Sequence, residues 1–95
     1  MNIAKAIRGK QRIRFTYDGQ SCVVEPHALG MDKRGFQALR AFQVGGSARS
    51  ATVKGWKLFH ADQMRDIELL AETFPHAQRG YRRADSPFWS IYEEL

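Results

Sequence analysis

The sequence contains a single cysteine, Cys22, among its 95 residues. One cysteine excludes an intramolecular disulfide framework and any paired-cysteine zinc or redox motif. The chain also lacks an uninterrupted apolar run of the roughly 18–20 residues that a membrane-spanning helix needs. Basic residues at Lys5, Arg8 and Lys10 interrupt the region where the apolar segment of a signal peptide would lie. These absences predict a cytoplasmic protein that is not exported and has no membrane partner.

Length and charge narrow the class further. A chain of 95 residues with 43% hydrophobic residues has the size of one domain, 1–95, and enough apolar surface to fold. Its 15 basic and 10 acidic residues give a formal net charge of +5. An excess of positive charge permits an anionic partner without requiring one.

A β-hairpin is the clearest local signal. Apolar and polar residues alternate over residues 12–17, which is typical of a strand with one buried face. Asp18-Gly19 supplies the two positive-φ positions of a type I′ turn, and residues 22–24 form the returning strand. Pro26 lacks an N–H group, so we expect the returning strand to weaken or bend there.

Further strands are expected at residues 36–44, 53–60 and 67–70. A turn at residues 32–35 precedes the first of these strands, and a small, polar loop at residues 45–50 follows it. Five short strands at regular spacing predict a mainly β domain with a small, strongly bent antiparallel sheet or barrel.

The N-terminal and C-terminal segments lack the strand pattern of the middle of the chain. Ile3 and Ile7 lie four residues apart and predict a short N-terminal helix with one apolar side. Residues 75–85 read as an extended basic arm. Ser86-Pro87 then favours the start of a helix, whose apolar residues follow at i, i+3, i+4 and i+7: Phe88, Ile91, Tyr92 and Leu95. This helix either completes the core or forms an interface with a partner, with Trp89 on its flank.

Three segments carry a family resemblance: IAKAIRGKQRIRFTYDGQSCVVEPHALG, GFQALRAFQ and GWKLFHADQMRDIELLAETF. Together they resemble the WYL domain over residues 3–74. The resemblance implies an SH3-like or Sm-like five-stranded barrel, which in this family usually follows a helix-turn-helix in bacterial transcription regulators. It also implies a ligand-sensing role, with single-stranded nucleic acid or a nucleotide as the favoured ligand, and dimerisation. The positions that match the family pattern are Ile3, Ala6, Ile7, Phe15, Tyr17, Val24, Pro26, Leu29, Leu39, Ala41, Leu58, Met64 and Leu69.

The chain departs from the family at its anion-binding positions. The Trp-Tyr-Leu triplet of the family falls on Gln37-Ala38-Leu39, and the basic position of the closing element falls on Gln63. These changes remove an aromatic ring and a guanidinium from the place where such domains bind anions. We also expect no operator-reading helix pair, because there is no room for one before Asn2.

Two groups of basic residues are candidate nucleic-acid contacts. Arg12 and Arg14 face away from the apolar side of their strand, and Arg40 and Lys57 are expected on neighbouring strands. These four charges would track a phosphate backbone. In the arm, Arg79 and Arg82 flank Tyr81, whose ring would stack on a base. The alternative for both groups is solvated surface, and Asp85, Glu93 and Glu94 are available to pair with the arm.

Catalytic and metal chemistry are not favoured. In a regular strand Cys22 faces away from Glu25 and His27, so the thiol lacks a neighbouring base. No spacing of histidine, cysteine and carboxylate residues resembles a metal motif, and we expect no cofactor. The sequence therefore predicts a non-enzymatic, regulatory ligand-binding module of WYL type. The alternative is a protein-interaction or oligomerisation module, in which the barrel edge and terminal helix dock on a larger regulator or form a homodimer.

Overall fold

The computed structural model describes residues 3–46, 54–83 and 88–95. Within these residues the chain forms a mainly β domain with one short α-helix, one 3-10 turn and six strands. In chain order the elements are α1 (Ile3–Arg8), β1 (Gln11–Tyr17), β2 (Gln20–Asp32), β3 (Gln37–Gly46), β4 (Gly55–His60), η2 (Ala61–Gln63), β5 (Arg65–Thr73) and β6 (Phe88–Glu94).

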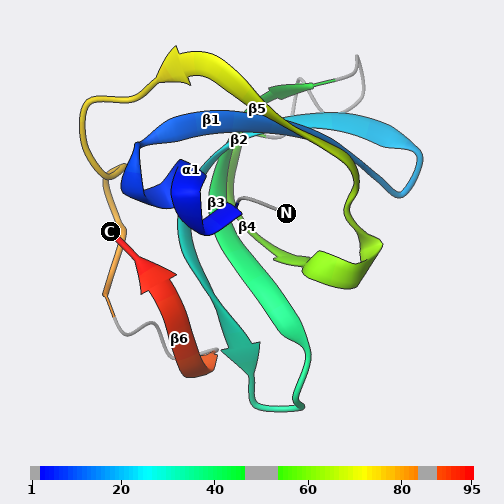
Figure 1. Cartoon of the computed structure of the whole chain (residues 1–95), viewed down its shortest axis with the longest axis vertical. Helices are drawn as coiled ribbons and strands as arrows, with labels where there is room; N and C mark the ends of the chain where they lie inside the picture. The colour runs from blue at the N-terminus through cyan, green and yellow to red at the C-terminus, as the bar shows by residue number, and fades with distance from the viewer. Residues whose placement is uncertain (1–2, 47–53, 84–87) are drawn as a thin grey trace.

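The six strands form one antiparallel sheet in the order β4-β3-β2-β1-β5, with β6 paired to β2 outside this path. Figure 1 shows the long strands β2 and β3 running side by side to their hairpin, with β6 against the second half of β2. The sequence predicted an antiparallel sheet of five strands, and the sixth strand is a correction that concerns the C-terminal segment.

The first hairpin forms as predicted. Ile13 and Phe15 of β1 are buried, and Arg14 between them is exposed. Asp18 and Gly19 have φ values of 51° and 73°, which are the left-handed conformations of a type I′ turn. The same alternation continues in β2, where Cys22 and Val24 face the core.

Strand β2 does not end at Pro26 but continues for 13 residues to Asp32. Pro26 pairs with Ala41 and Ala28 pairs with Arg40, so His27 is the extra residue of a β-bulge. The bulge provides the bend that the sequence predicted at Glu25-Pro26, while the strand itself persists because β3 pairs with one of its edges and β6 with the other.

The remaining predicted strands have different bounds. β3 includes Gly45 and Gly46, which were expected in the loop, and the rest of that expected loop, residues 47–50, lies outside the described residues. β4 begins at Gly55, and Val53 also lies outside them. β5 is longer than residues 67–70 and runs from Arg65 to Thr73.

The predicted C-terminal helix is wrong, because Phe88–Glu94 forms strand β6. Its predicted start at Ser86-Pro87 lies outside the described residues. The open edge of β2 supplies hydrogen-bonding partners for this segment. Gly30 permits the pairing, because a Cβ at this position would collide with the carbonyl oxygen of Ser90.

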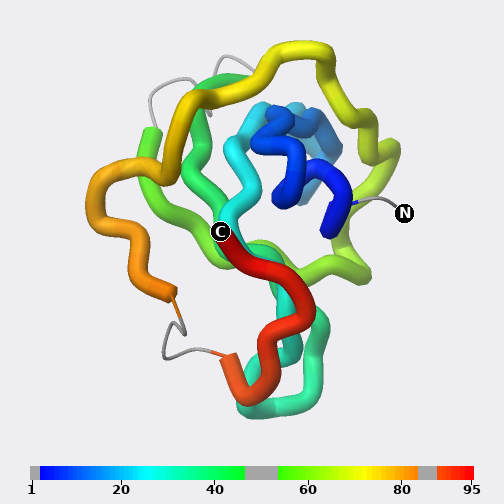
Figure 2. The backbone as a smooth tube through the Cα atoms, turned by 60° about the vertical axis from the view of Figure 1, so that its left-hand side comes forward, coloured from blue at the N-terminus to red at the C-terminus, as the bar shows by residue number. Residues whose placement is uncertain are grey.

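The sheet buries side chains on both faces. The main core lies on one face, where Ile3 and Ile7 of α1 pack with Ile13, Phe15 and other residues of the strands. A second cluster on the opposite face combines Ala28, Ala38 and Phe88 with half-buried neighbours. Figure 2 shows α1 and the orange segment after β5 on opposite sides of β2 and β3. We call this segment, residues 75–83, the arm.

Candidate functional site

Two ionisable residues lie buried beneath the arm. Glu25 and His27 of β2 are 1% and 0% exposed, on the face opposite the main core. The Arg12 side chain on β1 donates to Glu25, with its Nη2 2.9 Å from Oε2. His27 packs between the rings of Trp56, Phe74 and Tyr81, with centroid distances of 4.8, 5.4 and 5.0 Å.

The arm is attached to this buried pair by hydrogen bonds. The side-chain amide of Gln78 donates to Oε1 of Glu25 at 2.8 Å, and its backbone N–H donates to Nε2 of His27 at 3.0 Å. The hydroxyl of Tyr81 donates to the carbonyl of His27 at 3.3 Å. The indole N–H of Trp56 on β4 donates to the carbonyl of Arg79 at 3.2 Å. These bonds fix the arm against β2 and β4.

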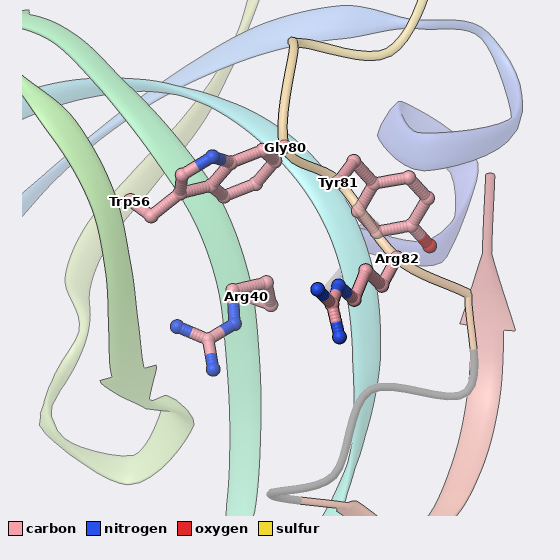
Figure 3. A pocket seen from close by; sticks show the side chains of 5 residues that line it. All are labelled: Arg40, Trp56, Gly80, Tyr81 and Arg82. Atoms are coloured by element: carbon pink, nitrogen blue, oxygen red, sulfur yellow. The ribbon is translucent and has the colours of Figure 1, made fainter.

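A pocket of about 300 Å³ opens between the arm and the sheet. Its lining comes from three elements: Arg40 on β3, Trp56 on β4, and Gly80, Tyr81 and Arg82 on the arm. In Figure 3 the guanidinium groups of Arg40 and Arg82 both appear below the rings of Trp56 and Tyr81, and both residues line the pocket. The pocket thus presents two positive groups next to two aromatic rings.

The register of the sheet explains why these side chains meet. Arg40 pairs with Leu58, and the neighbouring Phe42 pairs with Trp56, so all four project from the face that the arm covers. The Trp56 and Tyr81 rings are nearly parallel, with an interplanar angle of 25° and a centroid distance of 5.9 Å. Gly80 lies against the indole with φ near +90°, a conformation that favours glycine.

The strand residues predicted to track a phosphate backbone lie in separate places. Arg12 is paired with the buried Glu25. Arg14 is exposed and pairs with Glu68 of β5 at 3.5 Å. Lys57 pairs in register with the buried Ala41, so the alternation of β4 places it on the face opposite Arg40. Of the four predicted strand cations, only Arg40 lines the pocket.

The other predicted contacts are also divided. Tyr81 and Arg82 line the pocket, whereas Arg79 contributes its carbonyl to the Trp56 hydrogen bond and is exposed. Gln37 is exposed at the start of β3. Gln63 lines a different hollow of about 270 Å³, together with Asp18 and Gly19.

The residues predicted as an interface do not form one surface. Phe88 is buried in the second cluster, which Ile91 also contacts, and Leu95 packs against the main core. Tyr92 is 53% exposed, and the neighbouring Trp89 is 74% exposed.

Trp56 and Gly80 are the pocket residues that sequence reasoning missed. Within the strand predicted at residues 53–60, alternation places Trp56 and Lys57 on opposite faces. The missing signal was the arm, because no local pattern predicts that residues 75–83 fold back over β4.

The described residues bear on thiol and on metal chemistry. Cys22 is buried in the main core, and burial raises the pKa of its thiol, which disfavours the reactive thiolate. No group of three or more histidine, cysteine or carboxylate residues is placed to hold a metal ion in residues 3–46, 54–83 and 88–95. In the same residues no helix has the length and apolar character needed to cross a membrane.

Comparison of the chain with protein-family models, with curated proteins and with solved structures finds no match. The resemblance to the WYL domain therefore stays a prediction from the sequence.

Proposed function

We propose that this chain is a non-enzymatic regulatory domain that binds single-stranded nucleic acid or a nucleotide at the pocket between Arg40, Trp56, Tyr81 and Arg82. The observation that carries the proposal is the pairing of two guanidinium groups with two aromatic rings in one pocket of about 300 Å³. A guanidinium recognises a phosphate through several N–H donors, and an aromatic ring stacks on a base of any sequence.

A WYL-type, SH3-like or Sm-like barrel is the fold that we propose for this function. The strand order β4-β3-β2-β1-β5, the long bent β2 and the α1 helix over the core support it. The binding site differs from the family's, because Gln37 and Gln63 lie away from the pocket. In our proposal, Arg40 and the arm provide the cations that those positions lack.

The test is a titration of labelled oligonucleotides with the purified protein, followed by fluorescence anisotropy at two salt concentrations. We expect single-stranded DNA or RNA to bind more tightly than the duplex, with an affinity that falls as salt rises. Arg40→Glu and Arg82→Glu should each weaken binding and reduce the slope of affinity against salt by about one ion. A mononucleotide added as competitor measures how much of the affinity one nucleotide provides.

Arg14→Glu is the matched control, because it changes the net charge equally at an exposed strand position outside the pocket. Binding that falls as much in Arg14→Glu as in Arg40→Glu would show a diffuse response to net charge and contradict the pocket. A second readout is the fluorescence of Trp56 in a Trp89→Phe background, which a stacked base should quench. Absence of binding at low salt would refute the proposed function.

The second candidate function is protein interaction through β6. It is favoured by the exposure of Trp89 and Tyr92 on a strand that pairs only with β2 among the described residues. In this case a homodimer would form across β6. Tyr92→Asp should then convert a dimer into a monomer in sedimentation experiments without changing oligonucleotide affinity, and a wild-type monomer at high micromolar concentration would exclude this dimer.

A further inference from the structure

His27 has no access to the pocket, yet it is bonded to the segment that forms one wall of it. The ring is fully buried, and both of its nitrogens are engaged by backbone groups. Nε2 lies 3.0 Å from the backbone nitrogen of Gln78, and this N–H can only donate. Nε2 must therefore be the unprotonated nitrogen of the ring.

The second ring nitrogen completes the assignment. Nδ1 lies 2.8 Å from the carbonyl oxygen of Glu25, which can only accept a hydrogen bond, so Nδ1 carries the proton. The two bonds together fix one neutral tautomer of His27. A second proton would have to sit on Nε2, where it would point at the N–H of Gln78 and abolish one of the hydrogen bonds that hold the arm.

We propose that His27 is a pH-sensitive latch, and that its protonation releases the arm and dismantles the ligand pocket. The latch acts on the pocket through the chain itself, because Gln78 lies just before the pocket residues Gly80, Tyr81 and Arg82 on the arm. The inference rests on the proposed function for the pocket's role, but the latch itself is measurable without a ligand.

The groups around the His27 ring have opposing effects on its pKa. The Glu25 carboxylate on β2 favours a charged His27, but Arg12 of β1 and Gln78 of the arm already occupy its oxygens. The facing side chains from the other segments, Trp56, Phe74 and Tyr81, carry no charge near neutral pH. Burial is the largest influence and lowers the pKa of His27 below its ordinary value of 6.5.

Release of the arm exposes His27 to water, where the ring regains its ordinary affinity for a proton. The ratio of released to docked arm should therefore rise by up to about tenfold for each pH unit below 6.5, until the docked state also takes up the proton. The barrel below should stay folded, because α1 and the main core lie on the opposite face of the sheet.

Nuclear magnetic resonance of the ¹⁵N-labelled protein between pH 7.5 and 5.0 tests the latch directly. We expect the Gln78 amide and the Trp56 indole N–H to lose protection against hydrogen exchange together as the pH falls, while amides of the β1–β2 hairpin keep theirs. His27→Gln, which retains an acceptor and does not titrate, should abolish this transition. His76→Gln, a change of an exposed histidine on the same arm, should leave it intact.

Three results would overturn the latch: no acid transition in the wild type, an unchanged transition in His27→Gln, or a proton on Nε2 of His27 at pH 7.5. The last is read from the ring ¹⁵N shifts of the wild type, so it remains decisive even if His27→Gln does not fold.

Binding of a fluorescein-labelled oligo-dT at pH 7.5 and 5.5 then connects the latch to the pocket. Electrostatics alone would strengthen binding at the lower pH, because proton uptake makes the chain more positive. The latch predicts the opposite, a weaker affinity at pH 5.5 that His27→Gln prevents. An arm that opens while the affinity is unchanged would separate the latch from the pocket. Absence of binding at both pH values would refute the proposed function and leave the exchange result standing.

Discussion

Two arginines on the same strand illustrate how the partner decides what a charge contributes. Arg12 and Arg14 both project from the outer face of β1, and the sequence treats them alike. Arg12 pairs with Glu25, whose side chain is 2% exposed, whereas Arg14 pairs with Glu68, whose side chain is 60% exposed. When a buried carboxylate loses its partner, its desolvation penalty is no longer offset by an ion pair, whereas an exposed carboxylate is rehydrated.

We therefore predict unequal losses from two matched substitutions. Arg12→Ala should lower the free energy of unfolding by about 2–3 kcal/mol, less than for a fully buried pair because Arg12 is itself one-third exposed and Gln78 still bonds Glu25. Arg14→Ala should cost below about 1 kcal/mol. Urea denaturation of both variants measures the difference, and equal losses would contradict the structural role given to Glu25.

At the scale of elements, β6 shows why a helical pattern can belong to a strand. Two register shifts in its pairing with β2, one on each side of the Gly30–Met31 pairs, interrupt the regular alternation. As a result Phe88 and Ile91, three residues apart, contact the same cluster, although strict alternation would separate them. The spacing that indicates a helix is produced here by bulges, which a sequence pattern does not reveal.

The amino-acid composition of this segment favours a strand, whereas the spacing of its apolar residues favours a helix. Phe88–Glu94 contains Phe, Trp, Ile and Tyr, residue types that favour strands. The hairpin at Asp18-Gly19, by contrast, was predictable because its alternation is unbroken and its turn chemistry is specific. Local patterns thus define elements well where the pairing is regular and poorly where a bulge changes the register.

The strand assignment predicts different effects at two large side chains of β6. Ile91→Ala should destabilise the domain by about 1–2 kcal/mol, because half-buried Ile91 packs on the second cluster. Trp89→Ala, at a side chain 74% exposed, should stay within about 0.5 kcal/mol of the wild type. Thermal unfolding followed by circular dichroism compares them. A larger loss at Trp89 than at Ile91 would show that the segment packs in another way.

For the whole molecule, the decisive feature is that one sheet has two covered faces. The main core could be predicted from strand alternation, and its members Ile13, Phe15 and Val24 are buried as expected. The covered outer face could not, because it depends on contacts between residues about 50 positions apart in the chain, such as Gln78 with His27. The candidate site lies on this covered outer face. The sequence therefore indicated candidate basic residues but did not show which of them line one pocket.

His27, on the same covered face, makes the stability of the domain depend on pH in a defined direction. Because the pKa of His27 is lowered in the folded state by burial, the unfolded chain binds a proton more readily below pH 6.5. The free energy of unfolding should be highest above pH 6.5 and fall as the pH drops, by at most about 1.4 kcal/mol per pH unit for one proton. Asp32, whose pKa is lowered chiefly by the N–H of Phe36, acts near and below its ordinary value of 3.8, outside this window.

Urea denaturation at intervals between pH 8 and 5 measures this dependence, with His27→Gln expected to be flat over the window and His76→Gln expected to follow the wild type. The fall should also level off, because a released arm leaves His27 solvated on a sheet that stays folded, and no further stability is then lost to its protonation. The total fall in the free energy of unfolding before it levels off equals the free energy of docking the arm onto the sheet. A curve that falls equally in His27→Gln would mean that another group carries the pH dependence and that the arm is held independently of this histidine.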